Sequence, residues 1–152
     1  MNTIDHKNLP EILFEANQIA QSAGLKILEI YETDFSVVKK DDNSPLTLAD
    51  TEAHKIICES LSKLTPSIPI LSEESSHIDF SERSRWSQYW LVDPLDGTRE
   101  FIKKNGEFTV NIALVDGNKP ILGVVYVPVS ETSYIATINY GAHKSVKEND
   151  LK

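Results

Sequence analysis

The hydrophobic and polar positions divide the chain into a helical first part and a β-rich second part. Apolar residues recur every three or four positions over 10–32 and again over 48–64, which is the spacing of a buried helix face. Thr47 precedes the second stretch as a candidate N-cap, and Asp50 stands three residues later, where it can close a capping box. We therefore predict two amphipathic helices over these ranges.

Shorter apolar runs predict β-strands, most of them in the second half. The predicted strands are 35–39, 68–72, 89–92, 107–115, 120–127 and 133–138. The Asp116-Gly117 dipeptide between two of these runs is typical of a β-hairpin, so the later strands are expected to form an antiparallel meander. The polar stretches 41–45, 75–87 and 141–152 are predicted to be a turn, a surface loop and a segment without a clear fold. This order of elements indicates an α+β fold, with two N-terminal helices packed on one face of an antiparallel sheet.

Composition narrows the class of protein. The 152 residues are enough for one domain with a hydrophobic core, and the net charge of −8 disfavours a nucleic-acid polymer as partner. The single cysteine, Cys58, excludes an internal disulfide and fits a reducing compartment. The first ten residues lack the apolar core of a secretion signal, and no apolar run reaches transmembrane length. We expect a cytoplasmic protein, either free or held peripherally at the inner membrane face.

The stretch 90–98, Trp-Leu-Val-Asp-Pro-Leu-Asp-Gly-Thr, carries the candidate chemistry. The apolar run before it is expected to end at Asp93, because Pro94 cannot donate a ladder hydrogen bond. Asp93, Asp96 and the Leu95 carbonyl can then converge on one point. Oxygen-only ligands on a compact turn suit a hard cation, above all Mg²⁺.

The end of the same stretch is a candidate phosphate site. Gly97 supplies the backbone freedom that a tight turn needs. If Gly97 and Thr98 open a short helix, their free N–H groups favour a phosphate. Asp-Pro and Asp-Gly are also ordinary turn dipeptides, so the stretch by itself is as readily a plain turn as a metal site.

Two further acidic positions extend the pattern. Glu73 follows the strand predicted over 68–72, and Asp50 opens the second helix. Strand ends gathered at one edge of a sheet bring such ligands together, and a two-metal phosphatase needs several oxygens to hold cations roughly 3.5–4 Å apart. A hydroxyl and a carboxylate are useful to orient the attacking water, and Thr98 and Asp50 can form that pair.

Three segments in this order resemble the N-terminal signatures of the inositol monophosphatase superfamily. They are Pro-Leu-Thr-Leu-Ala-Asp at 45–50, Leu-Ser-Glu-Glu-Ser at 71–75, and 90–98. The run 97–114 resembles the CysQ-type 3′(2′),5′-bisphosphate nucleotidases more than the inositol monophosphatases proper. Several motifs in the correct order, from the first helix to about Gly141, reduce the plain-turn alternative to about one in twenty.

The resemblance implies a fold, an activity and a cofactor. The fold is the N-terminal half of a layered α/β sandwich. The implied enzyme uses two or more Mg²⁺ ions to hydrolyse adenosine 3′,5′-bisphosphate to AMP and phosphate. It clears this by-product of sulfate assimilation and is inhibited by lithium.

The resemblance also implies roles for individual residues. The implied metal ligands are Glu73, Asp93, the Leu95 carbonyl and Asp96, with Asp93 bridging two ions. The implied substrate-binding residues are Glu73, Leu95, Asp96, Gly97 and Thr98. The implied catalytic residues are Thr98, which is oriented by Asp50, and Glu73 nearby.

The chain departs from the family in its second half. The family carries a C-terminal α/β half with a Trp-Asp signature whose Asp completes the second metal site. Neither Trp86 nor Trp90 is followed by Asp, and no equivalent half follows Gly141. We therefore expect a metal-dependent phosphatase domain over 1–141, a truncated tail over 142–152, and weak or no activity of the chain alone. Self-association is also expected, through the sheet face and edge that this leaves exposed.

The sequence also allows other functions for the chain and other roles for its remaining polar residues. The alternative functions are an inositol or sugar monophosphatase, and a non-catalytic metal-binding half-domain that needs a partner chain. The four scattered histidines are expected to have structural or solvent-exposed roles, and Cys58 is expected to pack in the core. Glu74 is expected to lie on the surface or just outside the metal ligands. Lys39 and Lys40 could approach a phosphorylated substrate, but a solvated strand end is favoured for both. The expected core includes Phe101, Phe108, Val110 and Ile112.

Overall fold

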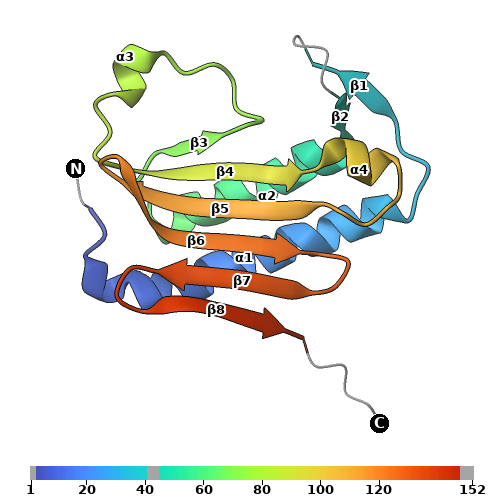
Figure 1. The fold of residues 1–152 in the computed structure, drawn as a ribbon. Helices are drawn as coiled ribbons and strands as arrows, with labels where there is room; N and C mark the ends of the chain where they lie inside the picture. Colours follow the sequence, from blue (N-terminus) through green and yellow to red (C-terminus); the bar gives the residue numbers. More distant parts are fainter. Residues whose placement is uncertain (1–2, 41–44, 148–152) are drawn as a thin grey trace.

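The computed structural model describes residues 3–40 and 45–147. A six-stranded sheet forms one layer, and helices α1 (Leu9–Tyr31) and α2 (Leu48–Leu64) lie together on one of its faces (Figure 1). The other elements are η1 (His6–Asn8), β1 (Val37–Lys39), β2 (Pro45–Thr47), β3 (Ile70–Ser72), α3 (Phe80–Arg83), β4 (Gln88–Asp96), α4 (Thr98–Ile102), β5 (Thr109–Asp116), β6 (Lys119–Val127), β7 (Thr132–Thr137) and β8 (Gly141–Val146). The predicted α+β class, with two helices on one face of the sheet, is confirmed.

The two long helices form where the apolar periodicity predicts them. α1 and α2 pack against each other, and on the sheet α1 lies mainly on β6 and α2 on β4. The buried stripe of α1 is rich in small residues and consists of Leu9, Leu13, Ala16, Ala20, Ala23, Gly24, Ile27 and Ile30. Small side chains let the helix approach the sheet closely, since a Cβ at Gly24 would lie 2.4 Å from Tyr126 Cε1. The second helix begins and ends at the predicted residues.

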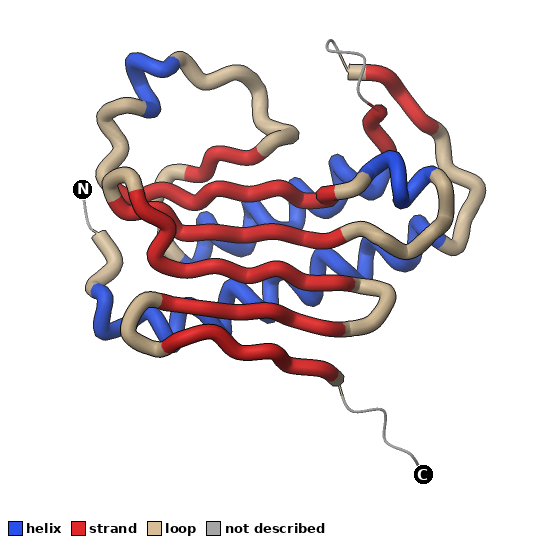
Figure 2. The backbone as a smooth tube through the Cα atoms, viewed as in Figure 1, coloured by secondary structure: helices blue, strands red, loops and turns tan. Residues whose placement is uncertain are grey.

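The sheet has the strand order β3-β4-β5-β6-β7-β8, and its neighbours pair antiparallel except for β3 and β4 (Figure 2). The predicted meander is therefore confirmed from β4 onward, and the Asp116-Gly117 turn joins β5 to β6 as expected. β3 is the exception. It pairs parallel with β4, with Ser72 opposite Val92, and the crossover between them contains α3. The parallel pairing places the carboxyl ends of β3 and β4 at the same edge of the sheet.

Three local predictions were wrong or incomplete. β4 does not end before Pro94 but continues to Asp96, because the register shifts between Asp93 and Asp96 and a proline is tolerated at such a bulge. The predicted loop 75–87 contains the one-turn helix α3. The expected tail after Gly141 forms β8, which pairs with β7 along its whole length. All six β8 residues are exposed, so no apolar alternation marked the strand.

The face of the sheet opposite the helices is open and apolar. Leu91 is 44% exposed, Val125 40% and Tyr134 46%. A shallow hollow of about 630 Å³ crosses β3 to β6 on this face. The exposed sheet face is thus present, while self-association through it stays a prediction.

The predicted core residues are buried on the helix side. Phe101, Phe108, Val110 and Ile112 are each at most 1% exposed. Of the predicted turn 41–45, residues 41–44 lie outside the described residues. Within the described part of the chain, no helix is long and apolar enough to cross a membrane.

Candidate metal and phosphate site

The ends of β3 and β4 meet the start of α4 at one corner of the sheet. A pocket of about 250 Å³ opens there, and it is lined by Lys40, Glu73, Asp93, Leu95, Asp96, Gly97, Thr98, Arg99 and Glu100. Glu73 N donates a hydrogen bond of 3.0 Å to Val92 O, which continues the β3–β4 ladder into the site. The structure therefore brings together all the residues predicted to bind metal and phosphate, although Glu73 and Asp93 are twenty positions apart.

Asp50 reaches this corner from the first turn of α2. Its carboxylate is fully buried and accepts hydrogen bonds from Thr47 N at 2.9 Å and Thr47 Oγ1 at 2.6 Å, which confirms the predicted capping interaction. Its other oxygen accepts a hydrogen bond of 2.8 Å from Thr98 Oγ1. A threonine hydroxyl that donates to Asp50 has only acceptor capacity left. The Thr98 oxygen can therefore accept a hydrogen bond from a water molecule and so orient the oxygen of that water.

Asp93 is the carboxylate with the most perturbed environment. Burial, the interaction with Glu73 and the negative charge of Asp96 raise the pKa of Asp93 from 3.8 to about 8. Asp93 Oδ1 is buried and has no hydrogen-bond partner among the described residues. A buried acceptor without a partner is costly. Crowded carboxylates with an orphaned oxygen are the situation that a bound cation relieves.

The donor set suits Mg²⁺ in its chemistry. Carboxylate oxygens of Glu73, Asp93 and Asp96 and the Leu95 carbonyl are hard ligands. The side chains do not yet have the geometry of a metal site: in the described ranges, no group of three or more His, Cys, Asp or Glu residues is arranged to hold an ion. Asp96 Oδ2 instead accepts a hydrogen bond of 3.0 Å from Asn111 Nδ2 on β5. The residues fit a cation by their type and because Asp93 Oδ1 has no partner among the described residues. The bond from Asn111 uses only Oδ2 of Asp96, so its other carboxylate oxygen remains available as a ligand.

Gly97 makes the turn from β4 into α4. Its φ of +95° lies in the left-handed region, and it is the N-cap of α4 as the sequence indicates. A Cβ at this position would lie 2.8 Å from Glu107 O. Only glycine therefore fits between the site and the 107–108 backbone.

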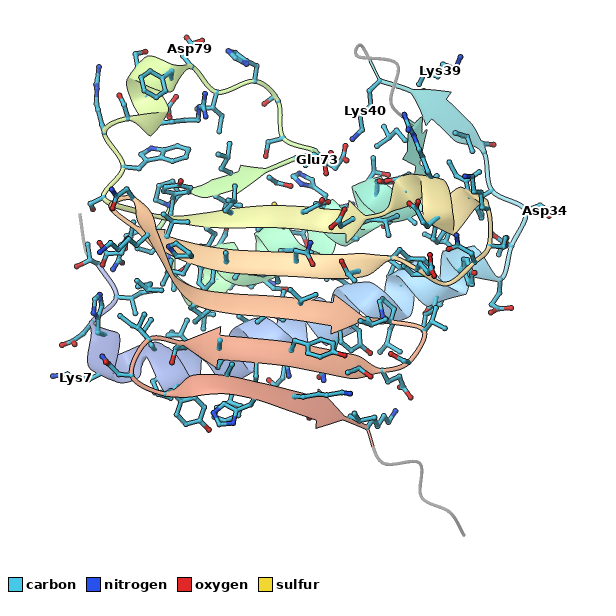
Figure 3. The ribbon with its side chains drawn as sticks, viewed as in Figure 1. Lys7, Asp34, Lys39, Lys40, Glu73 and Asp79 are labelled. Carbon is cyan, nitrogen blue, oxygen red and sulfur yellow. The ribbon has the colours of Figure 1, made fainter. Side chains whose placement is uncertain are left out.

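Lys40 was predicted to be a solvated strand end, but the structure places it among the carboxylates of the site. Its ammonium lies 2.5 Å from Glu74 Oε1 and 3.8 Å from Glu73 Oε1. Figure 3 shows Lys40 beside Glu73, while Lys39 lies on the outer side of β1. Burial by itself would lower the pKa of Lys40, but the carboxylates of Glu74, Glu73 and Asp50 outweigh burial and raise it. Burial raises the pKa of Glu74, and Lys40 opposes that rise.

Two other polar contacts near the site were not predicted. Asn111 lies on β5 opposite Asp93 and holds the Asp96 carboxylate. Ser72 Oγ, at the end of β3, lies 2.8 Å from His54 Nδ1 on α2. Burial lowers the pKa of His54, which favours its neutral form. Both contacts join strands or helices distant in sequence, so no local pattern could have indicated them.

Comparisons with known proteins place the chain in a family. The model of the inositol monophosphatase family matches residues 8–151. The chain belongs to this family. The 3′(2′),5′-bisphosphate nucleotidase CysQ of Escherichia coli (strain K12) is 54% identical over 127 residues, covering 82% of this chain and 51% of the relative. CysQ of Haemophilus influenzae is 40% identical over 144 residues, covering 95% of this chain and 52% of the relative.

Solved structures of the family show the same fold. CysQ from Bacteroides thetaiotaomicron aligns with a TM-score of 0.78 and 46% identity, over 93% of this chain and 52% of that one. The extragenic suppressor protein SuhB from Bartonella henselae aligns with a TM-score of 0.80 and 31% identity, over 89% and 52% of the two chains. The chain thus spans about half the length of the relatives that it matches.

Proposed function

We propose that this chain is the metal-binding part of a Mg²⁺-dependent 3′(2′),5′-bisphosphate nucleotidase. The reaction adds water across the 3′-phosphate ester of adenosine 3′,5′-bisphosphate and releases AMP and inorganic phosphate. The observation that carries the proposal is the 2.8 Å Thr98–Asp50 hydrogen bond in the same pocket as Asp93, whose buried Oδ1 has no hydrogen-bond partner among the described residues. That arrangement suits the activation of water next to a phosphate.

Different residues of the chain would bind the metal ions and the phosphate. Glu73, Asp93, the Leu95 carbonyl and Asp96 would hold two or more Mg²⁺ ions, with Asp93 shared. When bound, Mg²⁺ lowers the pKa of a water ligand and offsets the charge of the phosphate. The N–H groups of Gly97 and Thr98 would bind oxygens of the scissile phosphate.

Asp50 and Thr98 would prepare the nucleophile. Asp50 accepts a hydrogen bond from the Thr98 hydroxyl. The Thr98 oxygen would then accept a hydrogen bond from the attacking water, which would turn a lone pair of that water toward phosphorus. Glu73 lines the same pocket as Thr98 and would be a second acceptor for this water. The full burial of Asp50 and its two bonds from Thr47 keep this pair rigid.

The nucleotidase is favoured over an inositol or sugar phosphatase by the degree of similarity. The solved CysQ is 46% identical to this chain, and the inositol monophosphatase of Thermotoga maritima is 24% identical at a similar TM-score of 0.79. Sulfate assimilation and lithium inhibition remain predictions from the resemblance, and a cytoplasmic location remains a prediction from the composition. The domain division at residue 141 also remains a prediction.

The second candidate is a half-domain that binds metal and depends on another polypeptide for turnover. It is supported by the share of each relative that the chain covers, about 51% for Escherichia coli CysQ. We therefore expect a polypeptide of these 152 residues to bind Mg²⁺ but to turn over weakly or not at all by itself.

The test is phosphate release by the 152-residue chain with Mg²⁺ or with EDTA. Adenosine 3′,5′-bisphosphate and an inositol monophosphate are compared as substrates, alongside Asp93→Asn and Thr98→Val. Release from the nucleotide that needs Mg²⁺ and disappears in both variants supports the nucleotidase. Mg²⁺ binding without release supports the half-domain. Faster release from the inositol phosphate, or release that survives EDTA, contradicts the proposal.

A further inference from the structure

Two charged groups at the site have no part in the mechanism above, the Lys40 ammonium and the Glu74 carboxylate. The side chains of Lys40 and Glu74 are 21% and 8% exposed, whereas that of Glu73 is 53% exposed. The short contact of 2.5 Å is with Glu74, and the distance to Glu73 is 3.8 Å. The shielded ion pair is therefore Lys40–Glu74, and the Lys40–Glu73 contact is longer and more hydrated.

A metal ion at Glu73 has to share that carboxylate with Lys40. An ammonium and a divalent cation are attracted to the same oxygens and repel each other. If Lys40 paired fully with Glu73, it would occupy the oxygen that a metal needs. If Lys40 were absent, Glu73, Asp93 and Asp96 would repel one another without any nearby positive charge.

Hydrogen bonds hold the backbone around Glu74 in place. Glu74 N donates to Ser72 Oγ at 3.4 Å, and Ser72 Oγ is in turn bonded to His54 on α2. Ser75 N also donates to Ser72 O at 3.0 Å. The turn after β3 is thereby tied to α2, and from it the shielded Glu74 carboxylate accepts a hydrogen bond from the long Lys40 side chain.

We propose that Glu74 is a positioning residue that holds the Lys40 ammonium 3.8 Å from Glu73, near enough to offset the metal-free carboxylates and too far to take the metal's place. The inference rests on the proposed function only in treating Glu73 as a metal ligand. It assigns the two adjacent glutamates different tasks: Glu73 binds the metal, and Glu74 binds the lysine that would otherwise compete with it.

The test is Mg²⁺ affinity, measured by calorimetry and by the Mg²⁺-induced rise in melting temperature, so that no turnover is needed. Glu74→Gln keeps the side-chain shape but releases Lys40 to Glu73, and the affinity is expected to fall about fivefold. Lys40→Met removes the competing charge, and the affinity is expected to rise by a similar factor. Lys39→Met is the matched control. It removes the same charge from an exposed neighbour and is expected to change affinity by less than about twofold.

The double variant Lys40→Met/Glu74→Gln separates the two roles that Glu74 could have. If Glu74 acts through Lys40, the double variant binds Mg²⁺ as Lys40→Met does. If Glu74→Gln lowers the affinity by the same factor with and without Lys40, Glu74 ligates the metal itself and the inference is overturned. Binding by the unaltered chain that Lys40→Met leaves unchanged also overturns it. Failure of the unaltered chain to bind Mg²⁺ rejects the proposed metal site as well.

Discussion

Gly97→Ala is expected to damage both the stability of the chain and its site. Gly97 has a φ of +95° and a ψ of 41°, and a left-handed backbone costs a residue with a Cβ roughly 1–2 kcal/mol. The added Cβ would also lie 2.8 Å from Glu107 O and 3.3 Å from Phe108 Cα. Both are backbone atoms and cannot rotate away, so either α4 or the backbone of residues 107–108, just before β5, must shift. Overpacking of this kind costs about 1–3 kcal/mol.

Gly117→Ala is the matched control for this change. Gly117 also has a positive φ, +63°, but a Cβ there meets nothing within 4 Å. It should carry the backbone cost alone, so the two variants should differ by about 1–3 kcal/mol in the free energy of unfolding. Such a difference is large against a typical total of roughly 5–15 kcal/mol.

Urea unfolding followed by tryptophan fluorescence measures both variants, since Trp90 is fully buried in the core. The Mg²⁺-induced rise in melting temperature should also shrink in Gly97→Ala and persist in Gly117→Ala, because the shift displaces Thr98 and Asp96. Equal destabilisation by the two variants would refute the steric reasoning, because only the cost of the left-handed backbone would then be needed to explain both.

Three further predictions use other contacts. Asp93→Asn should raise the melting temperature in EDTA, because it removes a buried carboxylate crowded by Glu73 and Asp96, and should abolish the rise caused by Mg²⁺; a lower melting temperature in EDTA would argue against the crowding. Trp90→Phe should cost about 2–3 kcal/mol of unfolding free energy, because it leaves a cavity and removes the buried 2.9 Å bond from Nε1 to Thr65 Oγ1. The half-buried Trp86→Phe is its control, and similar costs would contradict the prediction. Hydrogen bonds from Gln88 and His6 lower the pKa of Asp116, so its stabilisation is present above the unfolded-state value near 3.8 and is lost as pH falls through the lowered folded-state value. Asp116→Asn should therefore be less stable than the original chain at pH 6 and approach it at pH 2, by a small amount because the pair is exposed to solvent; a gap that widens on acidification would contradict this.

The sequence by itself determined the features that depend on neighbouring residues. Helical periodicity located α1 and α2, because an amphipathic helix repeats its buried face within the chain. The Thr47–Asp50 cap and the Gly97 turn were also predictable, since each spans four residues or fewer. The candidate ligands Asp93, Leu95 and Asp96 stand within four consecutive residues, so their grouping was visible before any fold was known.

Contacts between distant segments were decided only by the tertiary structure. The parallel pairing of β3 with β4 places Glu73 beside Asp93, and nothing local distinguishes it from an antiparallel pairing. Lys40 reaches Glu74 across thirty-four positions, and its burial is a property of the assembled corner rather than of its neighbours in sequence.

The sheet also overrode two local rules. Pro94 stays within β4 because a bulge removes the need for its missing N–H, and β8 forms although both of its faces are exposed, because β7 offers an unpaired edge. Backbone pairing depends on which strand lies alongside, and only the folded chain supplies that neighbour.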